Sequence, residues 1–155
     1  MLKMICFDMD GTIANLYSVP NWLERLRAYD ATPYLIAEPM WDMETLAFLF
    51  DVARYRGIEI RVITWLSKET NKDYDDIVRI AKKAWLEQYG LHIDHFHGVA
   101  YGATKADSVR RELNEGETAI LFDDNAKVRQ GWHLGDTYDP TTCDICEVLK
   151  EILEL

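Results

Sequence analysis

The sequence has 155 residues and a formal net charge of −10, with 27 acidic against 17 basic side chains. This length suits one domain with a substantial core, and the acidic excess disfavours a long nucleic acid as a partner. No apolar stretch is long enough to cross a bilayer, no signal-peptide pattern opens the chain, and three cysteines make no disulfide framework. We therefore expect one domain over residues 1–155, located in the cytoplasm.

Five short β-rich segments predict the strands of a sheet. The first is the continuous apolar run of residues 4–7, which is typical of a strand buried on both faces of a parallel sheet. The other four predicted strands lie at residues 59–64, 95–100, 118–122 and 132–134.

Between these strands, helical spacing of apolar residues predicts four helices, at 42–56, 73–89, 105–114 and after Pro140. Asp42 is a suitable N-cap for the first helix, and Gly57 can stop it. In the second helix, the residues expected on the buried face are Ile77, Ile80, Ala81, Ala84 and Trp85. Strands that alternate with helices predict a three-layer α/β sandwich around a five-stranded parallel sheet.

Residues 13–40 interrupt this alternation after the first strand. They contain Pro20, Pro33 and Pro39 and are rich in aromatic side chains. An insertion at the carboxyl end of a parallel strand lies where α/β proteins keep their active-site loops, so we expect a small cap over such a site. The aromatic residues in or next to this segment either form the core of the cap or stack on a nucleobase; they are Tyr17, Trp22, Tyr34 and Trp41.

Acidic residues come in pairs directly after two of the predicted strands. Asp8 and Asp10 follow the first strand, and Asp123 and Asp124 follow the fourth. Either pair alone is also consistent with solvated or helix-capping aspartates. If the two strands are neighbours, however, four carboxylates meet at one edge of the sheet. Such a cluster requires a cation, and oxygen ligands of this kind suit a hard ion such as Mg²⁺.

Two further side chains complete a set suited to phosphate chemistry. Thr64 ends the second predicted strand, and Lys105 lies between the third and the fourth. An ammonium group beside a metal–carboxylate cluster balances the charge of phosphoryl oxygens, and a hydroxyl group orients them. A carboxylate can then act as the nucleophile.

Together these motifs resemble those of the haloacid dehalogenase-like hydrolases. Residues 8–12 match the DxDGT signature, Thr64 and Lys105 match the second and third motifs, and residues 121–124 match the fourth. The resemblance implies a Rossmann-like sheet in which the first strand lies between the second and the fourth.

The resemblance also implies a role for each matched residue. Asp8 would attack phosphorus and become the phosphoaspartate, and Asp10 would act as general acid and then as general base. Thr64 and Lys105 would hold the phosphate. The loop residues expected to help bind the substrate are Gly11 and Thr12. The residues expected at the Mg²⁺ site are Asp8, Asp10 (through its backbone carbonyl), Asp123 and Asp124.

An acid two positions after the nucleophile distinguishes phosphatases from dehalogenases within this superfamily, so Asp10 favours a phosphatase. The cap is similar to that of the deoxyribonucleotidase-like branch, which makes a nucleotide or another small phosphorylated metabolite the expected substrate. A sugar phosphate and a nucleic acid end are further options. A phosphoacceptor signalling domain is disfavoured because Lys105 precedes Asp123, and a catalytically idle phosphate-binding module because every chemical group is present.

Two other features are interpreted as structural. Cys143 and Cys146, together with His92, His95 and His97, could suggest zinc, but the cysteines open a helix and the histidines flank a strand. Lys82 and Lys83 are expected on a solvated helix surface.

Overall fold

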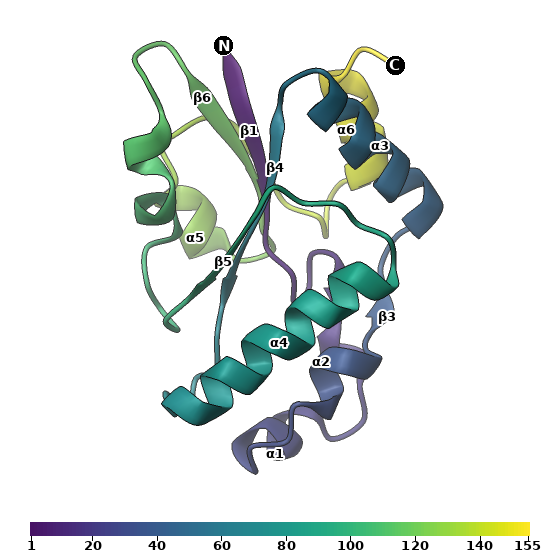
Figure 1. The fold of residues 1–155 in the computed structure, drawn as a ribbon, viewed down its shortest axis with the longest axis vertical. Helices are drawn as coiled ribbons and strands as arrows, with labels where there is room; N and C mark the ends of the chain where they lie inside the picture. Colours follow the sequence, from purple (N-terminus) through teal and green to yellow (C-terminus); the bar gives the residue numbers. More distant parts are fainter.

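A computed structural model describes residues 1–155, and its centre is a five-stranded parallel sheet (Figure 1). The strands are β1 (Leu2–Phe7), β4 (Glu59–Trp65), β5 (His95–Val99), β6 (Thr118–Phe122) and β7 (Thr137–Tyr138). Their order is β5-β4-β1-β6-β7, and each neighbouring pair is parallel. The predicted α/β class is confirmed, with the first strand between the second and fourth predicted ones.

Helices and turns cover both faces of this sheet. The four helices outside the cap are α3 (Met43–Tyr55), α4 (Lys72–Gln88), α5 (Ala126–Gln130) and α6 (Ile145–Ile152). The helices α3 and α6 lie together on one side of the sheet, and α5 lies on the other (Figure 1). Asp42 caps α3 as predicted, because its carboxylate accepts hydrogen bonds from the backbone N–H groups of Glu44 and Thr45.

The core is divided by β1, whose side chains alternate between the two faces. Ile5 and Phe7 belong to the larger cluster, which includes residues of α3, α4 and α6. Met4 and Cys6 belong to a smaller cluster on the opposite face. The ring of Phe7 lies 4.8 Å from that of Phe50 and 4.9 Å from that of Phe122, so aromatic packing anchors the strand that ends at Asp8.

The rotation of α4 about its axis differs from the prediction. Ile77 and Ile80 are 52% and 68% exposed, whereas Lys82 is fully buried. Two aromatic residues hold the helix in this orientation. The hydroxyl of Tyr74 donates to the carbonyl oxygen of Asp30 at 2.9 Å, and the indole of Trp85 donates to that of Ala37 at 2.8 Å. Both carbonyl groups belong to the segment before α3, so α4 is the support on which that segment rests.

Two predicted elements are wrong. Residues 105–114 form two short 3₁₀ turns, η2 (Lys105–Ser108) and η3 (Arg110–Glu112), in place of one α-helix. The fifth strand is β7, not residues 132–134, because Trp132 is a core residue. It is fully buried, and its indole donates to the carbonyl oxygen of Ala119 at 2.8 Å. The apolar residues at 132–134 therefore pack in the smaller core cluster, on one face of the sheet, and do not form a strand.

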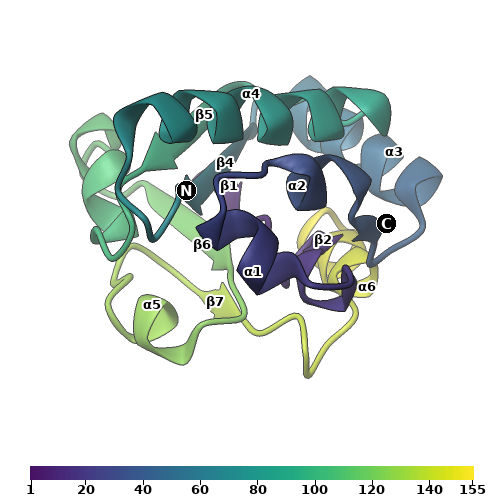
Figure 2. The ribbon, with the colours of Figure 1, turned by 90° about the horizontal axis from the view of Figure 1, so that it is seen from below.

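The insertion after β1 folds into a small cap that consists of a two-stranded sheet and two short helices. Its elements are β2 (Ala14–Asn15), η1 (Leu16–Ser18), α1 (Trp22–Arg27), α2 (Thr32–Ile36) and β3 (Glu38–Pro39). The strands β2 and β3 pair antiparallel and close the base of the insertion. Figure 2 shows α1 and α2 in front of the sheet end, with α4 beside them. The cap thus covers the edge of the sheet at which β1, β4 and β6 end.

No helix has the length and apolar character needed to cross a membrane.

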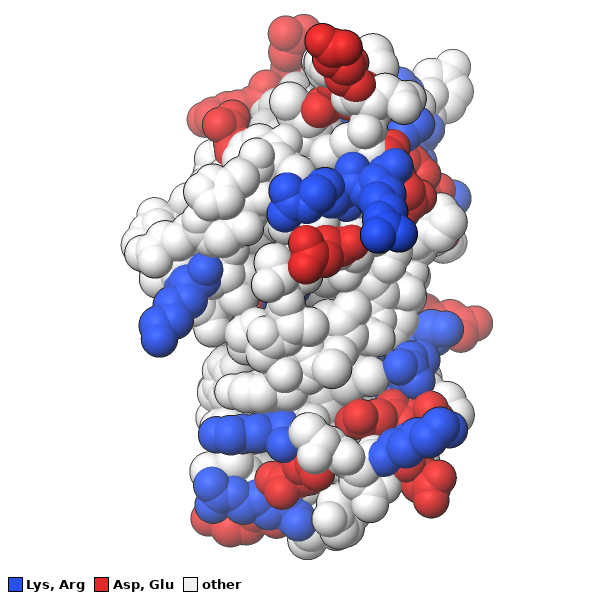
Figure 3. Space-filling model, turned by 90° about the vertical axis from the view of Figure 1, so that its left-hand side faces the viewer, with Lys and Arg blue, Asp and Glu red and all other residues white.

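On one face of the molecule, basic and acidic side chains lie next to each other around a largely uncharged middle (Figure 3). The three cysteines are free thiols. Cys6 and Cys146 are buried, and the Sγ of Cys143 donates to the carbonyl oxygen of Asp139.

Candidate active site

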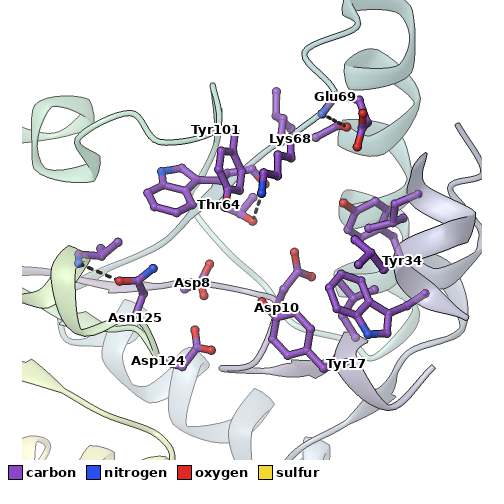
Figure 4. A pocket seen from close by; sticks show the side chains of 18 of the residues that line it. Asp8, Asp10, Tyr17, Tyr34, Thr64, Lys68, Glu69, Tyr101, Asp124 and Asn125 are labelled. Carbon is purple, nitrogen blue, oxygen red and sulfur yellow. Dashed lines mark hydrogen bonds between the residues drawn. The ribbon is translucent and has the colours of Figure 1, made fainter. Parts of the chain in front are cut away.

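The ends of β1 and β6 bring three aspartates together. The backbone N–H of Asp8 donates to the carbonyl oxygen of Phe122 at 2.9 Å, which ties the two strand ends to each other. Asp8, Asp123 and Asp124 each offer a carboxylate oxygen, and these oxygens lie within 4.8 Å of one another. In Figure 4 the carboxylates of Asp8, Asp10 and Asp124 face one shared space. The predicted convergence of the two acidic pairs is present in the structure.

Lys105 is the buried cation of this cluster. Its ammonium Nζ donates to Oδ1 of Asp8 at 2.9 Å and to Oδ2 of Asp123 at 2.7 Å. Burial disfavours the charge, but the two carboxylates outweigh it and raise the pKa of Lys105 above its ordinary value. The side chain therefore keeps its positive charge at the position where sequence reasoning expects a phosphate-binding lysine.

The acidic pair after β6 is crowded. Both oxygens of Asp123 accept hydrogen bonds, one from Lys105 and one from the backbone N–H of Asn125 at 2.9 Å. Burial, reinforced by the negative charge of Asp8, raises the pKa of Asp123 and of Asp124. The raised pKa values show that burial and mutual repulsion disfavour the negative charges of these carboxylates, and a bound cation would stabilise them in the ionised form. Carboxylate oxygens are the ligands that Mg²⁺ prefers, so Asp8, Asp123 and Asp124 fit a magnesium site.

The two loop residues predicted to bind substrate lie beneath the site and do not line the cleft. Gly11 has φ +80°, and a Cβ built on it would lie 2.4 Å from Oδ2 of Asp124. Thr12 is fully buried, and its hydroxyl donates to Oδ2 of Asp8 at 3.4 Å. Its backbone carbonyl accepts a hydrogen bond from the indole of Trp41. Both residues support the acids rather than face the substrate space.

Sequence reasoning missed Lys82. Its Nζ donates to Oδ2 of Asp10 at 2.8 Å, to Oγ1 of Thr64 at 2.7 Å and to the carbonyl oxygen of Trp65 at 2.9 Å. The expectation of a solvated surface is wrong for Lys82 and holds only for Lys83, which is exposed. Positions 78, 82 and 85 lie on one helix face, but the same spacing also allows a buried face with Ile77, so periodicity alone did not decide between them.

Neighbouring groups shift the pKa of Asp10 in opposite directions. Burial raises the pKa of its carboxyl group, the ammonium of Lys82 lowers it, and the charge of Asp8 raises it; the net direction is upward. A raised pKa suits a carboxyl group that has to donate a proton near neutral pH.

A cleft of about 370 Å³ opens above these groups. Its walls carry aromatic pairs: Tyr17 with Trp22 from the cap, and Trp65 with Tyr101, each with ring centroids 5.0 Å apart. Tyr17 and Tyr101 are 51% and 47% exposed although they are large aromatic residues. Of the other aromatics singled out in the sequence, Tyr34 lines the cleft, whereas Trp41 packs against the main core. Figure 4 shows Tyr17 and Tyr34 on one side and Tyr101 on another.

The sheet order and the small insertion after β1 are those of a haloacid dehalogenase-like α/β fold. No protein-family model matches the sequence, and no curated protein matches it either. Solved structures with the same fold include the D,D-heptose 1,7-bisphosphate phosphatase from B. bronchiseptica, in complex with magnesium and phosphate. It superposes with a TM-score of 0.63 at 13% identity, over 98% of each chain.

Two further structures share the fold. The D,D-heptose 1,7-bisphosphate phosphatase from Burkholderia thailandensis has a TM-score of 0.53 at 14% identity, over 86% of this chain and 74% of that one. A chain of the Pnkp1/Rnl/Hen1 RNA repair complex has a TM-score of 0.58 at 17% identity. The match to the repair complex covers 89% of this chain but only 42% of that one. At these identities the likeness concerns the fold.

Proposed function

We propose that this protein is a magnesium-dependent phosphatase that hydrolyses small phosphomonoesters through a phosphoaspartate on Asp8. The observation that carries the proposal is the convergence of carboxylate, hydroxyl and ammonium groups at one sheet edge beneath a cleft. The groups involved are Asp8, Asp10, Thr64, Lys105, Asp123 and Asp124. They are the groups that phosphoryl transfer needs: a nucleophile, an acid–base group and positive charge around the phosphoryl oxygens.

In the first step a carboxylate oxygen of Asp8 forms a bond to phosphorus, and the bond from phosphorus to the ester oxygen breaks. Asp10 gives its proton to the departing oxygen. In the second step water attacks the phosphoaspartate, Asp10 takes a proton from this water, and the carboxylate of Asp8 is released with inorganic phosphate. Lys105 and Thr64 hold phosphoryl oxygens in both steps. Mg²⁺ held by Asp8, Asp123 and Asp124 would supply further positive charge to those oxygens.

For the substrate we favour a phosphomonoester with a planar ring, such as a nucleoside monophosphate. The support is the aromatic lining of the cleft, since aromatic side chains bind nucleobases by stacking. Lys68 lies over the ring of Tyr101, at 5.7 Å from its centroid, and adds positive charge to the same wall. A sugar phosphate is the second candidate, because two structures with this fold are heptose bisphosphate phosphatases. A nucleic acid end is disfavoured by the net charge of −10.

The test compares a nucleoside 5′-monophosphate with ribose 5-phosphate, which has the same kind of leaving oxygen, on C5 of a ribose, but no base. Phosphate release should require Mg²⁺ and stop on chelation, and kcat/KM should be higher for the nucleotide. Tyr101→Ala should reduce kcat/KM for the nucleotide by roughly tenfold, because stacking on one base contributes about 1–3 kcal/mol. It should leave ribose 5-phosphate unaffected.

The matched control is Tyr55→Ala, since Tyr55 is 93% exposed and does not line the cleft. Equal rates with both esters, unchanged in Tyr101→Ala, would favour the sugar phosphate. If wild-type protein with Mg²⁺ releases phosphate from neither ester nor from p-nitrophenyl phosphate, the phosphatase proposal is wrong.

A further inference from the structure

The ammonium of Lys82 is buried in the middle of the candidate site, although α4 contributes no other residue to it. The side chain is 1% exposed, and each of its three hydrogen bonds is 2.9 Å or shorter. An ammonium group has three protons and accepts nothing, so these three contacts use its full capacity. No donor of Lys82 remains for a substrate, and its effect on the reaction must pass through its partners.

We propose that Lys82 is a positioning residue that fixes the Asp10 carboxylate and the Thr64 hydroxyl for phosphoryl transfer. The role rests on the proposed phosphatase function. At Asp10 the hydrogen bond to Oδ2 fixes the rotation of the carboxyl group, so the other oxygen is the one left to exchange a proton with the ester oxygen or water. At Thr64 the ammonium occupies a lone pair of Oγ1. The hydroxyl donates only a long hydrogen bond, of 3.4 Å, to the carbonyl oxygen of Trp65, so its proton can turn to a phosphoryl oxygen.

The third hydrogen bond of Lys82 also fixes the position of the backbone at the end of β4. Because Lys82 also donates to the carbonyl oxygen of Trp65, the last residue of β4 is held against α4. The loop after β1, the end of β4 and α4 therefore meet at one nitrogen atom. A shift of α4 would move Asp10 and Thr64 together, and their relative geometry would be kept.

The cap takes part in this arrangement through Tyr34. Its ring lies over the ammonium, with Nζ 4.9 Å from the ring centroid, and Tyr34 is only 6% exposed. The ring attracts the cation and keeps water away from it, and hydrogen bonds are stronger where water is excluded. A residue of the cap thus shields the ammonium that orients the acid–base residue.

The test uses two esters that differ in their need for a proton. The p-nitrophenolate leaving group departs without protonation, whereas an alcohol requires it, so loss of a well-placed acid slows only the alkyl ester. Lys82→Met keeps the length of the side chain and removes the ammonium. We expect kcat/KM to fall about 100-fold for the alkyl phosphate and less than about tenfold for p-nitrophenyl phosphate. The control is Lys83→Met, the exposed neighbour on the same helix.

A merely structural lysine would give a different result. If Lys82→Met folds and loses activity equally with both esters, Lys82 does not position Asp10 as the acid; if it loses none, Lys82 positions neither Asp10 nor Thr64. If it does not fold, Lys82→Arg takes its place, because the charge beside Asp10 is kept while the planar guanidinium cannot reproduce three ammonium bonds. The same selective loss, of about tenfold, is then expected, and equal losses again contradict the role. Wild-type protein that hydrolyses neither ester would instead refute the phosphatase function itself.

Discussion

Gly11 holds a left-handed conformation directly beneath the acidic cluster. Its φ is +80°, and the side chains of Asp124 and Tyr17 leave no room for a Cβ. Glycine is therefore required here twice, once for the backbone angle and once for the close approach of the Asp124 carboxylate. Because Gly11 has no side chain, the Asp124 carboxylate can lie directly against its backbone.

This requirement predicts the effect of Gly11→Ala, with Gly57→Ala as control. Gly57 has the same φ of +80°, but no atom lies within 4 Å of the position that a Cβ would take there. The control should lower the free energy of unfolding by about 1 kcal/mol, the cost of the left-handed angle alone. Gly11→Ala should cost about the same, because the atoms in its way are the ends of the Asp124 and Tyr17 side chains, which can move, but it should displace the Asp124 carboxylate and reduce Mg²⁺-dependent activity.

Urea denaturation and activity assays measure both variants. If Gly11→Ala keeps the Mg²⁺-dependent activity of the wild type, the close approach of Gly11 to Asp124 does not matter for the reaction.

At this scale the sequence identified the acids but not Lys82. Asp8 and Asp123 were predictable because strand ends place side chains at a common edge, whatever the details of packing. Lys105 lies in a turn after β5, and its place at the site was predicted from the resemblance of the motifs. Lys82 was not predictable, because its burial depends on the rotation of α4, and that rotation is decided by hydrogen bonds from Tyr74 and Trp85 to distant carbonyl groups. Helical spacing alone permitted the alternative face with Ile77.

Among the elements, the segment 105–114 departs most from its sequence pattern. Val109, with φ −128°, separates the two 3₁₀ turns, so no continuous helix forms. Tertiary contacts account for this shape. Lys105 points into the acidic cluster at one end, and at the other Glu112 accepts two hydrogen bonds from Arg61 of β4, at 2.6 and 2.8 Å. A regular helix would have to satisfy both ends at once, and such long-range demands leave no trace in local periodicity.

The link between Arg61 and Glu112 predicts the effect of Glu112→Gln. Arg61 is 2% exposed, so weakening its main partner should lower the free energy of unfolding by about 1 kcal/mol, a modest value because Glu112 itself is half exposed. Glu115→Gln, at an exposed site just after this segment, should have no effect.

The effect should also depend on pH. Hydrogen bonding from Arg61 lowers the pKa of Glu112 below its ordinary value of 4.5. A carboxyl group with a lowered pKa stabilises the fold fully above that ordinary value, and the stabilisation is lost as the pH falls through the lowered one. Wild type and Glu112→Gln should therefore differ most at neutral pH and converge in acid. A difference that stays constant from pH 7 to 3, by urea denaturation, would show that the ion pair is not its source.

For the molecule as a whole, the surface and the cleft are both acidic. A charge of −10 repels anionic substrates at long range. The cleft is itself acidic, because five acidic side chains line it against three basic ones, Arg27, Lys68 and Lys105. A cation bound by the aspartates would offset this excess of negative charge, so phosphate release is expected to depend steeply on the Mg²⁺ concentration.

The most direct measurement of the central claim is the mass of the protein, digested after rapid acid quenching during turnover with Mg²⁺ and substrate. The peptide that contains Asp8 should carry the mass of one phosphoryl group, and this adduct and the turnover should both be absent in Asp8→Asn. Asp73→Asn, at an exposed carboxylate of α4, should behave as wild type. Turnover that persists in Asp8→Asn, or a phosphoryl group found on another residue, would contradict the account.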